Sequence, residues 1–113
     1  MNKAEIFPYK PKRNIVVFGQ RDAWYKGIKQ CLINVKIVCD PVSNRNYESF
    51  IKKADVVWVH PKMSHSLFNK IKAIAKKLDK PFLYLDGRGG ENSAVQIYNF
   101  EEKGEYNNKY IRN

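Results

Sequence analysis

The amino-acid sequence predicts an α/β protein: a three-layer αβα sandwich around a four-stranded parallel sheet of strand order 2-1-3-4, a Rossmann-like fold. Three observations predict it. Short apolar segments alternate with segments of helical periodicity four times along the chain. Residues 56–59 are apolar at every position, which is typical of a strand covered on both faces. The right-handed crossover rule then places helices on both sides of the sheet, with the switch in topology between the first and third strands.

Each element has its own signal. Gly19 closes the first strand, and Asp22 can cap the helix that follows by accepting backbone N–H bonds. Leu67 begins the clearest amphipathic pattern, and Pro81 can open the last strand because no ladder donor is needed there. The expected strands are 13–18, 35–39, 56–59 and 81–85, and the helical patterns are 24–32, 47–54, 67–78 and 94–98.

The length of 113 residues, with 43% of them hydrophobic, predicts one domain with a modest core. We expect an N-terminal arm at 1–12, a Rossmann-like domain at 13–100 and a C-terminal tail at 101–113. Cys31 and Cys39 are expected to be small apolar residues of buried segments. No apolar stretch approaches the ~20 residues of a membrane span and no signal-peptide core is found, which favours a cytoplasmic protein without a membrane partner.

The chain is strongly basic, with 21 Lys and Arg against 11 Asp and Glu and a formal net charge of +10. Such a charge attracts nucleotides, nucleic acid and acidic membrane surfaces. A solubilising surface without a functional role explains the same excess. A basic patch located at a hollow would favour function.

Loops at the carboxyl edge of the sheet carry the candidate ligand-binding residues. In open α/β sheets, ligands bind outside the carboxyl ends of the strands, where helix N-termini favour anions. The loops after Gly19 and His60 should stand side by side there. Arg21, Lys62 and Arg88 could form a cradle for phosphate. The full candidate set is Gly19, Gln20, Arg21, His60, Lys62, Ser64, His65, Ser66, Asp86, Arg88, Gly89 and Gly90.

His65 is the leading candidate, because an imidazole beside two hydroxyls at a helix N-terminus can hydrogen-bond a phosphate or a ribose. In the alternative, Ser64 or Ser66 caps the helix and His65 packs on its first turn. A metal ion shared by His60 and His65 lacks a third ligand at suitable spacing, so neither a metal nor a cofactor is expected.

The sequence contains none of the common catalytic motifs. The first loop is neither a GxGxxG fingerprint nor a Walker motif, and the chain has no GxSxG elbow. Ser64 and His65 are adjacent in sequence and cannot easily adopt a Ser-His catalytic geometry. These observations favour a binding protein over an enzyme.

Several features together resemble one known family. They are the strand-end Gly19, Ala54 and Asp55 ahead of a valine-rich strand, Ser64 and His65 opening the next helix, and Lys80 and Pro81 before the last strand. In these features the chain from Arg13 to Gly90 is similar to the bacterial family called domain of unknown function 2325. The resemblance implies a Rossmann-like fold and the position of the site, and it carries no biochemical function.

The function expected from these residues is the capture of a phosphate-bearing small molecule, a nucleotide or a nucleotide-derived signal, without turnover. Such a protein would act as a sensor, or as a sponge that sequesters a signal, as small phage-encoded binders do. Three alternatives stay open. They are a nucleic-acid-binding protein, supported by the charge and by Trp24; an enzyme using Asp40 or Asp86 as a base on a nucleotide or nucleoside; and a homo-oligomer or interaction module held by its tails.

Overall fold

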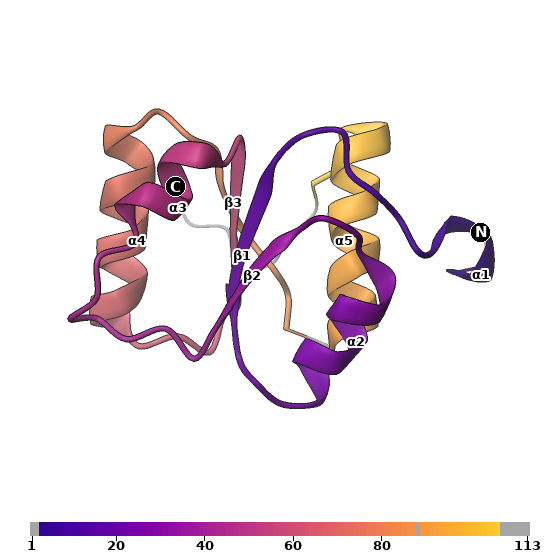
Figure 1. The fold of residues 1–113 in the computed structure, drawn as a ribbon, viewed down its shortest axis with the longest axis horizontal. Coiled ribbons are helices and arrows are strands. Elements are labelled where there is room, and N and C mark those ends of the chain that lie inside the picture. Colours follow the sequence, from indigo (N-terminus) through magenta and orange to yellow (C-terminus); the bar gives the residue numbers. More distant parts are fainter. Residues whose placement is uncertain (1–2, 88, 107–113) are drawn as a thin grey trace.

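The structure, a computed structural model, describes residues 3–87 and 89–106. Its four-stranded, all-parallel sheet has the order β2-β1-β3-β4, which confirms the predicted α/β Rossmann-like fold (Figure 1). The strands are β1 (Ile15–Gly19), β2 (Lys36–Cys39), β3 (Val56–Val59) and β4 (Phe82–Tyr84). The helices are α1 (Lys3–Ile6), α2 (Ala23–Cys31), α3 (Glu48–Lys53), α4 (His65–Lys77) and α5 (Gly90–Lys103).

The sheet separates two core layers. Side chains alternate between the faces of a strand, so neighbours along β1 enter different layers. Val17 and Trp58, which stand opposite each other in the β1–β3 register, pack with α2 and α5. Val16 and Phe18 pack with α3 and α4 on the other face. Figure 1 shows the two helix pairs on opposite sides of the sheet, and this double cover explains why residues 56–59 are apolar throughout.

Helices α2 and α5 approach closely because glycines lie at their contact. A Cβ atom on Gly90 would stand 2.0 Å from the carbonyl oxygen of Trp24 and 2.2 Å from the backbone nitrogen of Ile28. A Cβ atom on Gly27 of α2 would stand 3.1 Å from the Cα atom of Gly90. The absence of a side chain at Gly90 therefore serves helix packing.

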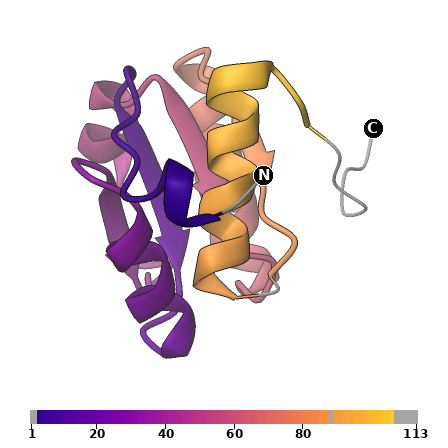
Figure 2. The same cartoon turned by 90° about the vertical axis from the view of Figure 1, so that its right-hand side faces the viewer.

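The last helix is longer than the sequence indicates. It begins at Gly90 and runs to Lys103, beyond the expected pattern at 94–98 (Figure 2). Phe100 continues the packing against the core, which holds the additional turn in place. Gly104 then ends the helix in the left-handed conformation, with φ of 68°. Glu101 onward was expected to be tail, yet residues 101–103 are helical.

The N-terminal arm packs along this extended helix. The Tyr9 hydroxyl donates to the carboxylate of Glu102 at 2.6 Å. Arg13 pairs with Glu101 through its guanidinium group. Burial, together with the neighbouring Glu102, raises the pKa of the Tyr9 hydroxyl above its ordinary range. The arm therefore packs across its own domain.

Candidate functional site

The loops after β1 and β3 lie side by side at the carboxyl edge of the sheet, as predicted. The backbone N–H of His60 donates to the carbonyl oxygen of Phe18 at 2.9 Å, and that of Asp40 donates to Gly19 at 2.8 Å. The strand order switches between β1 and β3 at this edge, which is where open α/β sheets bind ligands.

Trp24 fills the crevice at the switch point. A Cβ atom on Gly19 would stand 2.2 Å from two atoms of the indole ring, and Trp24 is only 4% exposed. Its indole N–H donates to the hydroxyl of Ser93 in α5 at 2.9 Å. Gly19 therefore makes room for a side chain of the protein itself.

His60 packs edge to face against Trp24, with 5.3 Å between the ring centroids, and is 3% exposed. Its Nδ1 atom accepts a hydrogen bond from the backbone N–H of Lys62 at 3.1 Å, which requires that this nitrogen carry no proton. Burial lowers the pKa of the His60 imidazole, Lys62 lowers it a little further, and the opposing effect of Asp22 is smaller than that of burial. His60 thus stabilises its own turn from the core, whereas the sequence placed it at a ligand.

His65 stays at the surface beside a hollow at the start of α4, which we call the α4 hollow. Ser64 caps the helix, because its Oγ atom accepts the backbone N–H of Leu67 at 3.3 Å. The hydroxyl of Ser66 lies 3.5 Å from that of Ser64, and Lys62 is exposed on the same loop. The α4 hollow measures about 220 Å³ and is lined by Val59, Pro61, Met63, His65, Phe68 and Tyr84.

Arg21 borders a different hollow, at the start of α2. This hollow of about 450 Å³ is lined by Arg21, Asp22, Ala23, Tyr25 and Lys26. The Arg21 guanidinium lies 5.1 Å from the ring centroid of Tyr25, and its backbone N–H donates to Asp40 at 3.1 Å. Asp22 caps α2 as predicted, accepting the backbone N–H of Trp24 at 2.8 Å. Gln20, half-buried, precedes this group.

Arg21 and His65 therefore do not line one shared hollow. Helices α2 and α4 cover opposite faces of the sheet (Figure 1), and the Trp24–His60 pair occupies the crevice at the switch point. Sequence spacing placed both residues correctly at the carboxyl edge. It could not show that the indole of Trp24 would lie over Gly19, because that depends on a side-chain conformation.

Of the two glycines in the loop after β4, Gly87 serves packing. Gly87 adopts φ of 78°, and a Cβ atom there would stand 2.7 Å from the ring of Pro61. Gly89 has φ of 122° and open space beside it. The backbone N–H of Asp86 donates to the side chain of Gln96 at 3.0 Å, which attaches this loop to α5. Arg88, the third member of the expected phosphate cradle, lies outside the described residues.

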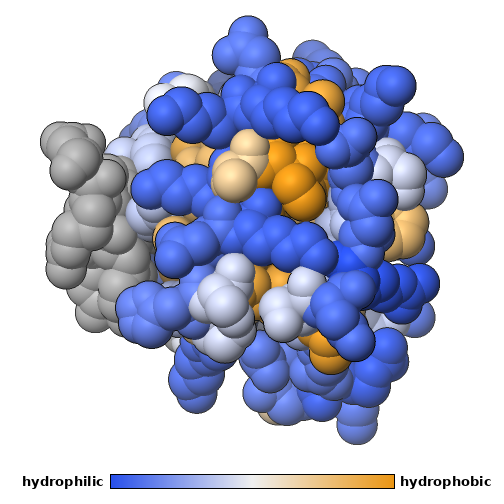
Figure 3. All heavy atoms as spheres, turned by 90° about the vertical axis from the view of Figure 1, so that its left-hand side faces the viewer, coloured by the Kyte–Doolittle hydropathy of each residue, from blue (hydrophilic) through white to orange (hydrophobic). Residues whose placement is uncertain are grey.

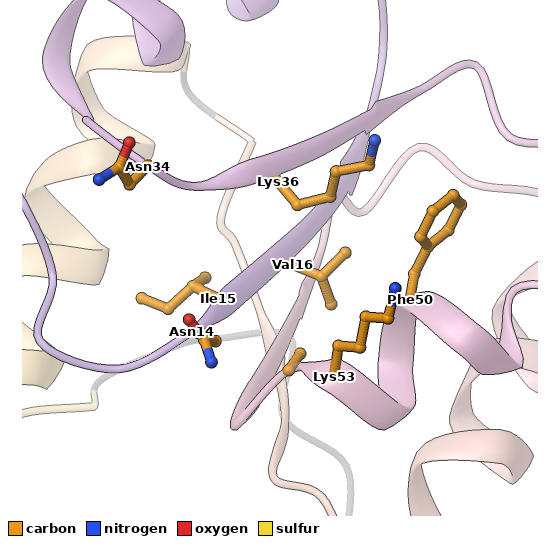
Figure 4. A pocket seen from close by; sticks show the side chains of 8 residues that line it. Asn14, Ile15, Val16, Asn34, Lys36, Phe50 and Lys53 are labelled. Atoms are coloured by element: carbon orange, nitrogen blue, oxygen red, sulfur yellow. The ribbon is translucent and has the colours of Figure 1, made fainter.

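A larger hollow lies at the opposite, amino edge of the sheet, where the sequence suggested no site. This amino-edge groove measures about 610 Å³ and is lined by Asn14, Ile15, Val16, Asn34, Lys36, Phe50, Lys53 and Ala54 (Figure 4). One sequence signal was available. Lys36 interrupts an otherwise apolar segment, VKIVC, and a lysine among apolar strand residues calls for an explanation.

Within residues 3–87 and 89–106, no three His, Cys, Asp or Glu side chains are grouped so that they could hold a metal ion. None of the helices described there is long and apolar enough to cross a bilayer. No protein-family model, no curated protein and no solved structure matches the chain. The fold thus defines a Rossmann-like α/β protein, and the resemblance to domain of unknown function 2325 stays a prediction.

Proposed function

We propose that this protein binds a phosphate-bearing small molecule, a nucleotide or a nucleotide-derived signal, at the α4 hollow and releases it unchanged. The observation that carries the proposal is the exposed His65 at the first position of a 13-residue helix, on the rim of a hollow. Lys62, Ser64 and Ser66 lie on the same short segment. A cation, hydroxyls and an imidazole together match the acceptor oxygens of a phosphate.

The helix start adds a favourable field. The first backbone N–H groups of an α-helix have no partner within the helix, and the dipole favours negative charge there. Ser64 takes the N–H of Leu67, which leaves the amides of His65 and Ser66 directed at the end of the helix. The hollow is smaller than the ~300–1,000 Å³ of sites for drug-sized ligands. Its lining is mainly apolar, so it would take only part of a nucleotide, with the phosphate at the rim beside His65 and the start of α4.

The hydrogen bonding of Ser64 favours binding without turnover. The Ser64 hydroxyl is engaged in capping α4, and His65 follows it directly in the sequence. A serine nucleophile needs a base that is brought to it from a separate segment. The arrangement at α4 suits recognition of a ligand.

The test is calorimetric titration with inorganic phosphate, nucleoside monophosphates, cyclic nucleotides and ADP-ribose. We expect His65→Asn and Lys62→Gln each to weaken binding of the preferred ligand by about tenfold, equivalent to about 1.4 kcal/mol. Lys26→Gln on α2 removes one charge elsewhere and should leave the affinity unchanged. Wild-type affinity in both α4-hollow variants would refute the site. Mass spectrometry should recover the ligand intact, and a converted product would show an enzyme instead.

A nucleic-acid-binding function is the second candidate, because the excess positive charge lies mainly on one layer. Residues 36–80, which contain α3 and α4, carry ten Lys and Arg against four Asp and Glu. Residues 1–35 and 81–106, which contain α2 and α5, carry nine against seven. Figure 3 shows long hydrophilic side chains across the α3–α4 face, with small apolar patches between them. Basic faces of this kind bind phosphate backbones.

A further inference from the structure

The amino-edge groove combines features that recognise an anion carrying a flat ring. It lies between the start of β1, the start of β2 and the end of α3, on the face covered by α3 and α4 (Figure 4). Its volume of about 610 Å³ falls within the ~300–1,000 Å³ of small-molecule sites. It lies at the edge of the sheet opposite to the α4 hollow, so it extends beyond the function proposed above.

Two lysines from separate elements supply the charge. Lys36 comes from β2 and Lys53 from the last turn of α3, and both ammonium groups lie on the Phe50 side of the groove (Figure 4). The Lys36 ammonium stands 4.8 Å from the centroid of the Phe50 ring. Within the part of the chain that the structure describes, neither lysine forms an ion pair. Asp55, the nearest carboxylate in sequence, instead accepts the backbone N–H of Asn14 at 2.9 Å.

Each lysine also has a structural role that does not neutralise its charge. Lys53 lies at the C-terminal end of a helix, where a cation is stabilised by the helix dipole. Lys36 covers the ring of Phe50. A cation–π contact and a helix end both leave an ammonium group with donors for a further acceptor.

Two carboxamides lie on a fixed part of the backbone. The carbonyl oxygen of Asn14 accepts the backbone N–H of Asp55 at 2.7 Å, so Asn14 is held to Asp55 in both directions. Asn34 is held in a tight turn with φ of 61°, the left-handed conformation that asparagine tolerates. A carboxamide offers a donor and an acceptor together, which is also what the edge of a nucleobase offers.

We propose that the amino-edge groove is a binding site for a nucleoside phosphate. The phosphate would lie between the ammonium groups of Lys36 and Lys53. The base would lie over the apolar floor at Val16 and Ala54, beside the edge of Phe50. The carboxamides of Asn14 and Asn34 would then hydrogen-bond the base, which would give the site its selectivity among nucleotides.

The test uses NMR titration of the ¹⁵N-labelled full chain with AMP, GMP, CMP and UMP, each in a separate experiment. We expect shifts at the side-chain amides of Asn14 and Asn34 and at the backbone amides of Lys36 and Phe50. The double variant Lys36→Gln with Lys53→Gln should weaken binding by about tenfold or more, because it removes both charged groups that would donate to the phosphate. Inorganic phosphate should bind more weakly than the preferred nucleotide.

The matched control is Lys72→Gln with Lys76→Gln, which removes the same charge from α4 and should leave nucleotide binding unchanged. The proposal would be overturned if no chemical shifts changed at about 1 mM nucleotide, or if both double variants lost the same affinity for the nucleotide. His65→Asn separates the two sites. If this variant loses nucleotide binding while the Lys36 and Lys53 double variant keeps it, the nucleotide binds at the α4 hollow. That result contradicts a site in the groove. An oligonucleotide that binds while all four monophosphates fail would also contradict it.

Discussion

His60 is buried in the core, and its burial determines how readily its imidazole takes up a proton. Burial lowers the pKa of its imidazole below the ordinary value of 6.5. The unfolded chain therefore takes up a proton at higher pH than the folded chain. The free energy of unfolding should fall as the pH drops through about 6.5, by at most about 1.4 kcal/mol per pH unit for one proton. Denaturant unfolding from pH 7.5 to pH 5 measures this dependence.

The variant His60→Asn isolates this effect from the titration of the carboxylates. The amide oxygen of asparagine can replace Nδ1 as the acceptor for the Lys62 N–H, and it does not titrate in this range. We expect the variant to lose part of the acid sensitivity of the wild type. His65→Asn, at an exposed position, should retain it. An identical pH profile for His60→Asn and wild type would show that His60 is not the titrating group.

Local hydrogen-bonding roles could be predicted from the sequence, whereas the environment of the rings could not. Asp22 caps its helix as expected, and Ser64 caps the next one, as the alternative interpretation of His65 had it, because a cap depends on residues two or three positions away. The burial of His60 depends on Trp24, which lies 36 positions earlier in the chain and contacts it only in the folded protein. His65 is exposed, so its position at the start of α4 could be predicted from the neighbouring sequence alone.

The contact of α2 with α5 depends on the missing side chain of Gly90. In Gly90→Ala the new methyl carbon would meet backbone atoms of Trp24 and Ile28, which cannot move aside as a side chain can. We expect the free energy of unfolding to decrease by about 3 kcal/mol or more, measured by denaturant unfolding. Gly27→Ala is the matched control on α2, and we expect it to lose less stability. Its new methyl carbon would stand 3.1 Å from the Cα atom of Gly90, and alanine favours a helix interior by about 1 kcal/mol relative to glycine. A Gly90→Ala variant as stable as the wild type would contradict the assigned contact.

Strand order was predictable because parallel strands and right-handed crossovers leave few arrangements of this chain. The order β2-β1-β3-β4 and the paired loops at Gly19 and His60 follow from that rule. The length of α5 was not predictable, since residues 101–103 are polar and their helix is held by Phe100 and by contacts of Tyr9 and Arg13 from the other end of the chain. The amino-edge groove was missed for the same reason: Asn14, Lys36 and Lys53 converge only in the fold.

The whole molecule separates its charge between the two helix layers. Cations dominate the layer of α3 and α4, whereas the acidic residues of α5 offset cations near the N-terminus of the chain, as in the pair of Arg13 with Glu101. Several lysines of the basic layer already have partners: Lys70 donates to the carbonyl of Ser43 at 2.6 Å, and Lys77 pairs with Glu48 at 3.2 Å. Lys72 and Lys76 are exposed on α4 and, within the described residues, form no ion pair.

Lys72 and Lys76 therefore provide the sharpest test of nucleic-acid binding. Each lysine that contacts a phosphate steepens the fall of log affinity with log salt by about 1. If α3 and α4 form the interface, Lys72→Gln with Lys76→Gln should flatten this slope by about 2 in fluorescence anisotropy titrations with a duplex and a single-stranded oligonucleotide. Lys26→Gln with Lys29→Gln on α2 removes the same charge from the opposite layer and should keep the wild-type slope. Equal flattening in both pairs would indicate attraction by net charge alone, and a wild-type slope already near zero would remove nucleic acid as a partner.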